Sequence, residues 1–252
     1  EQHFQEQNAR EERRRAETGE VRPRVVPVAF DDLGAPAGIA MVIAYATSVD
    51  DGRLDQEYEF RSDWVWSDDH LDHFTAEPAV YLFSNYLWSH ERCLEVSRRI
   101  KERSPNSITV HGGPDTPKYE DDTVAYFETY PHIDVTVRGE GEATAAAVLT
   151  ALRPVIGQDQ PDLSVLADVE GITYRSASGP VRTEDRDRIA ELDSIPSPLL
   201  SGLLDVYREM PGMMVTIETT RGCPYGCTFC DWGSATTSRV RKYDIDRVYA
   251  EL

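Results

Sequence analysis

The stretch around which this sequence is organised reads Thr219-Thr220-Arg221-Gly222-Cys223-Pro224-Tyr225-Gly226-Cys227-Thr228-Phe229-Cys230-Asp231-Trp232-Gly233. It holds three of the four cysteines in the spacing C-x-x-x-C-x-x-C, directly after residues 214–218, which are predicted to form a short strand. Three thiolates on one loop can hold three irons of a four-iron, four-sulfur cluster and leave the fourth iron open to a small molecule. The spacing therefore predicts Cys223, Cys227 and Cys230 as cluster ligands.

Zinc is the alternative metal that these cysteines could bind. Structural zinc usually takes four tight protein ligands, and the remaining cysteine, Cys93, lies far back in the chain. Cys93, Val96 and Ile100 share one face of a helix predicted over residues 89–103, so Cys93 is interpreted as a core residue.

Composition limits the class of protein. With 252 residues and 40% hydrophobic residues, the chain can bury a full core. Its 26 Lys and Arg against 45 Asp and Glu give a net charge of −19, which disfavours nucleic acid as a partner. We expect no membrane partner, because no run is apolar enough for a span or a signal. Clustered cysteines need a reducing compartment, so the expected location is cytoplasmic.

Three short apolar runs, over residues 79–83, 108–110 and 133–137, alternate with helical patterns over residues 89–103 and from Glu142 onward. Continuous apolar strands are usually buried on both faces, which predicts a parallel sheet in a doubly wound, Rossmann-like α/β domain. Upstream of them, a first strand is expected over residues 25–30, and a second over residues 57–65. A buried helix is expected over residues 38–46, and a short acidic helix or turn over residues 68–74.

The segments that follow the three apolar runs are rich in small and polar residues. They read Ser84-Asn85-Tyr86-Leu87-Trp88, His111-Gly112-Gly113-Pro114 and Arg138-Gly139-Glu140-Gly141-Glu142. In a parallel open sheet, loops at the carboxyl ends of strands form the ligand crevice. We therefore expect a broad ligand to approach the backbone at these glycines and the helix start near Glu142.

The cysteine motif, the aromatic Phe229 before its last cysteine and the preceding strand resemble the signature of radical S-adenosylmethionine (SAM) enzymes. The three loops upstream of that motif resemble the cobalamin-binding domain of the cobalamin-dependent branch. The similarity continues through a hairpin over residues 171–181 and a connector over residues 192–198. The resemblance implies three cofactors: a 4Fe-4S cluster on the three cysteines, S-adenosylmethionine on its open iron, and cobalamin. It implies that the cobalamin is lined by Ser84, Asn85, Trp88, Gly112, Gly113, Pro114, Gly139, Glu140, Gly141 and Glu142.

The same resemblance predicts four regions. Residues 1–24 form a charged tail or solvated helix, and residues 25–155 the cobalamin-binding domain. Residues 156–209 form a connector with a β-hairpin, and residues 210–252 the beginning of a radical SAM (β/α) barrel. A barrel needs on the order of 200 residues, so the chain is expected to hold only the truncated start of one.

The Asp-x-His-x-x-Gly loop, from which many cobalamin proteins place a histidine on cobalt, is absent from the sequence. The nearest histidine in such a setting is His70, in the segment Asp68-Asp69-His70-Leu71-Asp72-His73. However, this segment precedes an apolar run instead of following one. The resemblance instead implies no histidine on cobalt, with Trp88 as a cover of that face or as a packed aromatic at a helix start.

Function follows from the resemblance. It implies a methyltransferase that acts on an unactivated carbon or phosphorus centre of a small natural-product or peptide substrate, through methylcobalamin and a 5′-deoxyadenosyl radical. A flavodoxin- or ferredoxin-type protein would supply electrons. The alternatives are a non-methylating rearrangement or cyclisation enzyme with the same cofactors, or a non-catalytic cobalamin-binding module. A nucleic-acid methylthiolating enzyme is disfavoured by the acidic charge and the lack of cysteines for a second cluster.

Overall fold

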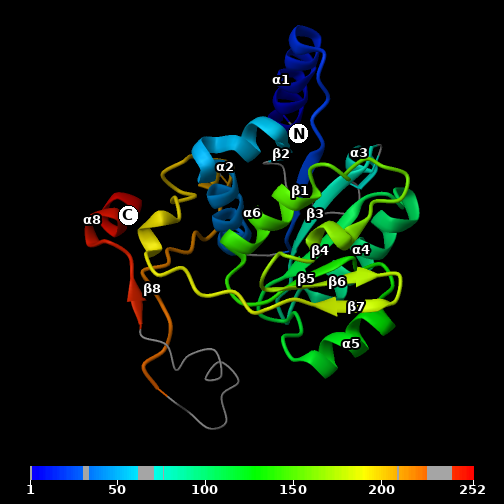
Figure 1. Ribbon diagram of the computed structural model, residues 1–252. Helices are drawn as coiled ribbons and strands as arrows, with labels where there is room; N and C mark the ends of the chain where they lie inside the picture. The colour runs from blue at the N-terminus through cyan, green and yellow to red at the C-terminus, as the bar shows by residue number, and fades with distance from the viewer. Residues whose placement is uncertain (1, 31–33, 62–70, 76, 209, 226–239) are drawn as a thin grey trace.

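The computed structural model describes residues 2–30, 34–61, 71–75, 77–208, 210–225 and 240–252. Its centre is a seven-stranded sheet in the order β2-β1-β3-β4-β5-β6-β7 (Figure 1). The first five strands in this order pair in parallel, β6 pairs antiparallel with β5, and β7 pairs antiparallel with β6. The strands are β1 (Arg24–Val28), β2 (Glu59–Phe60), β3 (Ala79–Ser84), β4 (Ile108–Gly112), β5 (Val135–Val137), β6 (Ile172–Ser176) and β7 (Gly179–Arg182).

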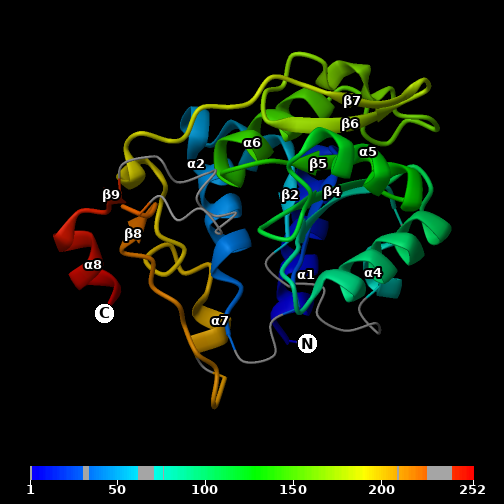
Figure 2. The same cartoon turned by 90° about the horizontal axis from the view of Figure 1, so that it is seen from below.

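Helices connect the parallel strands and cover both faces of the sheet. Figure 2 shows α2 and α6 on one side and α4 on the other. The helices are α1 (Gln2–Thr18), α2 (Ala37–Glu57), α3 (Leu71–Phe74), α4 (His90–Arg103), α5 (Glu120–Thr129), α6 (Gly141–Leu152), α7 (Asp205–Arg208) and α8 (Ile245–Glu251), with the 3₁₀ turns η2 (Leu163–Leu166) and η3 (Leu192–Ser194). The predicted doubly wound α/β fold is confirmed.

Alternation along β3 explains why both faces need a cover. Val80 and Leu82 belong to the core under α2 and α6, whereas Tyr81 and Phe83 belong to the core under α3 and α4. Successive side chains of a strand point to opposite faces, so a run that is apolar throughout buries area on both sides. The same packing buries Cys93 completely on α4, as predicted for a core residue.

The hairpin predicted over residues 171–181 is also present, and it extends the main sheet. β6 pairs with β5 in antiparallel register, with Thr136 opposite Thr173, and β7 pairs with β6. The hairpin that the resemblance assigned to the connector therefore adds two strands to one edge of the parallel sheet.

The predicted strand over residues 214–218 is wrong. Met214 makes only an isolated bridge to Gly34, and the ladder forms later, between β8 (Thr220–Arg221) and β9 (Arg241–Lys242). A single bridge leaves residues 215–217 without a neighbouring ladder, although their composition favours a strand. The predicted second strand is shorter than expected, with only Glu59–Phe60 paired, and residues 62–70 lie outside the described residues.

The N-terminal segment forms the helical alternative of the two predicted states. Helix α1 projects beyond the sheet, and its chain returns to β1 (Figure 1). One face is anchored: the Glu11 carboxylate accepts hydrogen bonds from Arg14 and Arg22, and the Gln7 side-chain amide donates to the Phe60 carbonyl at 2.7 Å. Burial would raise the pKa of Glu11, but these arginines lower it to about 2.

Candidate functional site

A cavity of about 510 Å³ lies at the carboxyl ends of the parallel strands β3, β4 and β5. The parallel topology brings the three loops that follow these strands to one edge of the sheet. The start of α2, strand β8 with its neighbours Glu218 and Gly222, and Arg241 of β9 complete the wall. Its lining includes Gly38, Val42, Ser84, Tyr86, Gly112, Gly113, Pro114, Thr116, Lys118, Arg138, Gly139, Glu140, Gly141, Glu142, Arg188, Glu218, Arg221, Gly222 and Arg241.

Most of the residues predicted to line the cobalamin lie in this wall: Ser84, Gly112, Gly113, Pro114, Gly139, Glu140, Gly141 and Glu142. Asn85 and Trp88 are the exceptions. Trp88 is 67% exposed, and its ring stacks on Tyr86, a wall residue, at a centroid distance of 4.7 Å. Trp88 therefore lies beside the lining residue Tyr86 and is not itself part of the lining.

Asn85 is fully buried behind the wall, which corrects its expected place. Its Nδ2 lies 3.1 Å from His111 Nδ1, and His111 Nε2 lies 3.0 Å from the Ser97 hydroxyl. The loops that contain Asn85 and Gly113 approach each other closely at these two residues. The Asn85 carbonyl oxygen is only 2.6 Å from the position that a Cβ on Gly113 would take. Asn85 thus holds the loops together from behind.

Glycine backbone forms a large part of the wall. Gly38, Gly112, Gly113, Gly139, Gly141 and Gly222 all border the cavity. Side chains at these positions would narrow the space, so their absence lets a broad ligand reach backbone N–H and C=O groups. Helix α6 begins in the wall at Gly141, with no side-chain cap hydrogen bond from Glu140. Its first N–H groups and the positive end of its dipole favour polar or anionic ligand atoms.

Two arginines bridge this wall to the β8–β9 pair. Arg221 pairs with Glu142 and, at 2.8 Å, with Glu218. Arg241 pairs with Glu140, with one contact at 3.1 Å, and also donates to the Ile189 carbonyl. Burial would raise the pKa of Glu140, but hydrogen bonds from Arg241 and the Ile189 N–H, with the nearby positive charges, lower that pKa below its ordinary value.

Cys223 follows Arg221 by two residues and adjoins the wall residue Gly222, and it is partly buried. Cys227 and Cys230, the other predicted cluster ligands, lie outside the described residues, as does His70. Within the described ranges, no group of three or more His, Cys, Asp or Glu side chains is placed to hold a metal ion. The cluster-ligand assignment therefore stays a prediction from the motif.

Sequence reasoning missed the wall residues outside the three loops. Gly38 follows the first strand and therefore shares its carboxyl edge, so the same topological rule could have found it. Arg221 lies inside the cysteine stretch but has no ligand chemistry of its own there. Arg188 and Arg241 carry no local signal, because only the tertiary fold brings them to the cavity.

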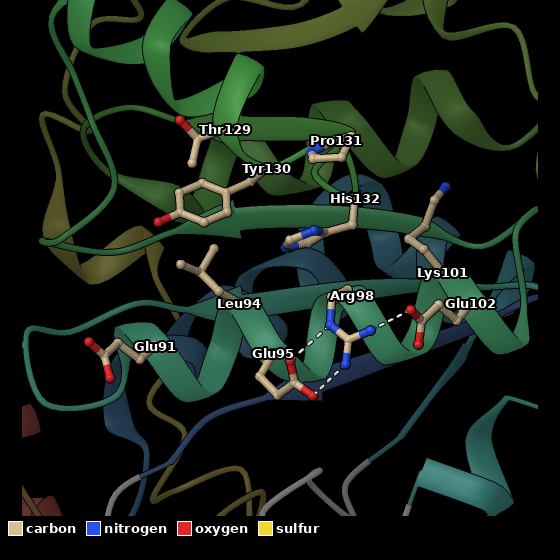
Figure 3. A pocket seen from close by; sticks show the side chains of 10 residues that line it. All are labelled: Glu91, Leu94, Glu95, Arg98, Lys101, Glu102, Thr129, Tyr130, Pro131 and His132. Atoms are coloured by element: carbon tan, nitrogen blue, oxygen red, sulfur yellow. Dashed lines mark hydrogen bonds and ion pairs between the residues drawn. The ribbon is translucent and has the colours of Figure 1, made fainter.

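A second hollow, of about 620 Å³, lies between α4 and the turn after α5 (Figure 3). Three of its charged side chains pair with each other: Arg98 contacts Glu95 at 2.7 Å and also pairs with Glu102. None of the residues predicted for a site lines it. The wall at the carboxyl edge is therefore the candidate functional site.

None of the described helices has the length and apolar character needed to cross a membrane.

Comparison with known proteins identifies relatives of this chain. It is 37% identical over 182 residues to "Cobalamin-dependent radical SAM methyltransferase TokK" of Streptomyces tokunonensis. The matched region covers 70% of this chain and 25% of that protein. It is 35% identical over 182 residues to "2-(S-pantetheinyl)-carbapenam-3-carboxylate methyltransferase" of Streptantibioticus cattleyicolor, with the same coverage. The chain thus spans about a quarter of the length of these curated relatives. No family model matches the sequence.

The fold is similar to a solved structure, that of the radical S-adenosylmethionine methyltransferase TsrM from Kitasatospora setae with cobalamin and a [4Fe-4S] cluster bound. The TM-score is 0.56 at 17% sequence identity, and the match covers 92% of this chain and 45% of TsrM. At this identity the likeness concerns the fold, which agrees with the predicted fold class.

Proposed function

This chain is related in sequence to the cobalamin-dependent radical SAM enzymes, and on that basis we propose that it is the cofactor-binding part of a methyltransferase of that kind. The methyl acceptor is an unactivated carbon of a small natural-product or peptide substrate. The cofactors are cobalamin, a 4Fe-4S cluster and S-adenosylmethionine.

One observation carries the proposal: a single cavity is bordered by all three predicted corrin loops and by the residues just before Cys223. Both cofactors must act on the same bound substrate, so their binding elements need to face one cavity. Arg221 and Gly222 provide that link on the cluster side, and the Gly139–Glu142 segment provides it on the corrin side.

The wall residues fit a corrin. Its ring edge carries many amide groups, which bind well to exposed backbone N–H and C=O groups such as those at Gly139 and at the start of α6. The six bordering glycines leave the backbone open to a broad, flat molecule. When bound, the cofactors supply a radical and a transferable methyl group, and the protein's part is to bind and orient them.

The cluster ligands are Cys223, Cys227 and Cys230. A cluster held by thiolates needs a reducing compartment, so the proposal includes a cytoplasmic location. It also includes a flavodoxin- or ferredoxin-type electron donor, because cleavage of S-adenosylmethionine at the cluster consumes an electron.

The first test is spectroscopic. The protein is purified without oxygen, supplied with iron, sulfide and hydroxocobalamin, and compared with a Cys223→Ala, Cys227→Ala, Cys230→Ala triple variant. The broad iron-sulfur absorption should be lost in the variant, whereas corrin bands should remain in both proteins, because the corrin site lies in the sheet domain. A colourless protein that binds zinc, or one that retains no corrin, would contradict the proposal.

The second arm separates methylation from the alternatives, using the complete protein and methyl-labelled S-adenosylmethionine. Label in a substrate-derived product supports methyl transfer. Formation of 5′-deoxyadenosine without transferred label favours a rearrangement or cyclisation enzyme. Corrin retention with no cleavage of S-adenosylmethionine favours a non-catalytic binding module.

A further inference from the structure

Glu140 and Glu142 stand in the cavity wall, but their carboxylates are turned to protein partners. Arg241 Nη1 lies 3.1 Å from Glu140 Oε2, and Glu140 Oε2 also accepts the Ile189 N–H at 2.9 Å. Glu142, only 5% exposed at its side chain, pairs with Arg221. Both acids of this segment are therefore satisfied before any ligand arrives.

The two arginines come from the two strands of one short ladder. Arg221 ends β8 and Arg241 begins β9, and the two residues are direct partners in the antiparallel register. Arg221 lies 3.9 Å from Glu140 as well, so the four residues form one connected network. We call Arg221, Arg241, Glu140 and Glu142 the charge clamp.

Apolar packing alone gives the β8–β9 pair little support. The small cluster beside it has four buried residues, Met41, Leu192, Ile195 and Tyr243, with Tyr45, Ile189 and Val248 partly buried against them, whereas the main core spans the sheet, α2 and α6. Because apolar contacts are non-directional, a small cluster leaves the orientation of a two-residue ladder weakly specified. Charged hydrogen bonds, which are directional, can fix that orientation.

We propose that the charge clamp is a positioning device that fixes the β8–β9 pair, and with it Cys223, against the Gly139–Glu142 segment. This inference rests on the proposed function for its meaning, because it couples the wall of the corrin site to the strand that leads into the cluster motif. Arg221 and Arg241 are positioning residues, because they act through Glu140 and Glu142 to orient the two binding elements.

The test is a double-mutant cycle read by hydrogen exchange in the whole chain without cofactors. The reporter is the Tyr243 amide, which donates to the Thr219 carbonyl at 3.2 Å across the ladder. Glu140→Gln and Arg241→Gln should each speed its exchange by about tenfold, and the double variant should be no faster than the worse single variant. Exchange in β3 and β4 should stay unchanged.

Glu95→Gln is the matched control. It neutralises a glutamate in an ion pair of similar length, with Arg98, but on the exposed face of α4, and it should leave the Tyr243 rate at the wild-type value. Wild-type exchange in both clamp single variants, or additive effects in the double variant, would overturn the clamp.

Coupling between the two sites gives a second reading. Binding of hydroxocobalamin should slow Tyr243 exchange in the wild-type chain and leave it unchanged in the double variant, because the link through Glu140 is then missing. Equal slowing in both proteins would overturn the proposed coupling. If the wild-type chain binds no corrin, the proposed function fails, whereas the exchange cycle without cofactors still judges the clamp.

Discussion

His111 shows how a single residue at the carboxyl edge can be structural. Its imidazole is fully buried and stacks on the Phe83 ring, with 4.2 Å between the ring centroids. The side chains of Asn85 and Ser97 lie within hydrogen-bond distance of its two ring nitrogens. Burial lowers the pKa of His111 well below its ordinary value, and the charges of His132 and His90 lower it further. The imidazole is therefore neutral, with Nδ1 accepting from Asn85 and Nε2 donating to Ser97.

This predicts a specific pH dependence of stability. An unfolded histidine takes up a proton below about pH 6.5, but the folded state holds His111 neutral, so the unfolded state binds more protons. The stabilisation is fully present above pH 6.5 and falls as the pH drops, by up to about 1.4 kcal/mol per pH unit. Urea unfolding between pH 7.5 and about 5.5 should show this slope, and His111→Asn should reduce it.

Ser97→Ala is the control for that experiment. It removes a hydrogen-bond partner of the imidazole and keeps the titrating group. The variant should lose stability at every pH but retain the slope. If His111→Asn and the wild type share one slope, the buried neutral imidazole is refuted.

At the scale of one element, the loop after β4 depends on Gly113. Its φ is +102°, and an added Cβ would meet the Asn85 carbonyl oxygen at 2.6 Å and the Asn85 nitrogen at 2.9 Å. Both contacts are with backbone, so no flexible side-chain end can move away. Gly139, at the end of the next strand, also has a positive φ, +73°, but nothing lies within 4 Å of its Cβ position.

Gly113→Ala should therefore destabilise the protein by about 2–4 kcal/mol, since backbone strain and steric overlap add. Gly139→Ala should cost about 1 kcal/mol, from its left-handed backbone alone. Chemical denaturation of the two variants measures the difference. Equal losses would mean that the approach of the loop to Asn85 is not rigid.

At the scale of the whole molecule, the connector packs into the core of the sheet domain. Leu204 and Tyr207 are buried in the same apolar cluster as Val25, Val80 and Leu149. The sequence predicts a boundary near residue 155 between domain and connector. We propose that the two predicted regions nevertheless unfold as one cooperative unit.

Leu204→Ala tests that unity. Removing a fully buried leucine side chain should cost about 2–5 kcal/mol, because it loses transfer free energy and leaves a cavity. Far-UV circular dichroism and the exchange of β3 amides should report the same loss. A β3 stability that is unchanged by Leu204→Ala would show that the connector unfolds separately.

The local sequence was sufficient for the strands β1, β3, β4 and β5, for the helices α4 and α6, and for the loops at the carboxyl edge of the sheet. Apolar runs such as residues 79–83 predict buried strands by themselves, because a strand buried on both faces carries mostly apolar side chains. Parallel topology then places the loops at Ser84, Gly112 and Gly139 together, since parallel strands end at one edge. The cysteine spacing likewise predicts its metal chemistry without a fold.

Only the tertiary structure decided how these parts meet. Arg241 is 101 residues from Glu140, and Arg221 is 79 residues from Glu142, so no local pattern could show that these charges pair. Asn85 was expected to line the cavity from its place after β3. It is buried instead, and its burial depends on which loop packs against it, which the local sequence does not show. Residues 214–218 favour a strand, but a strand needs a partner, and the pairing with β9 lies at Thr220 and Arg221. Contacts between distant segments depend on the packing of the whole chain, and composition and periodicity do not encode them.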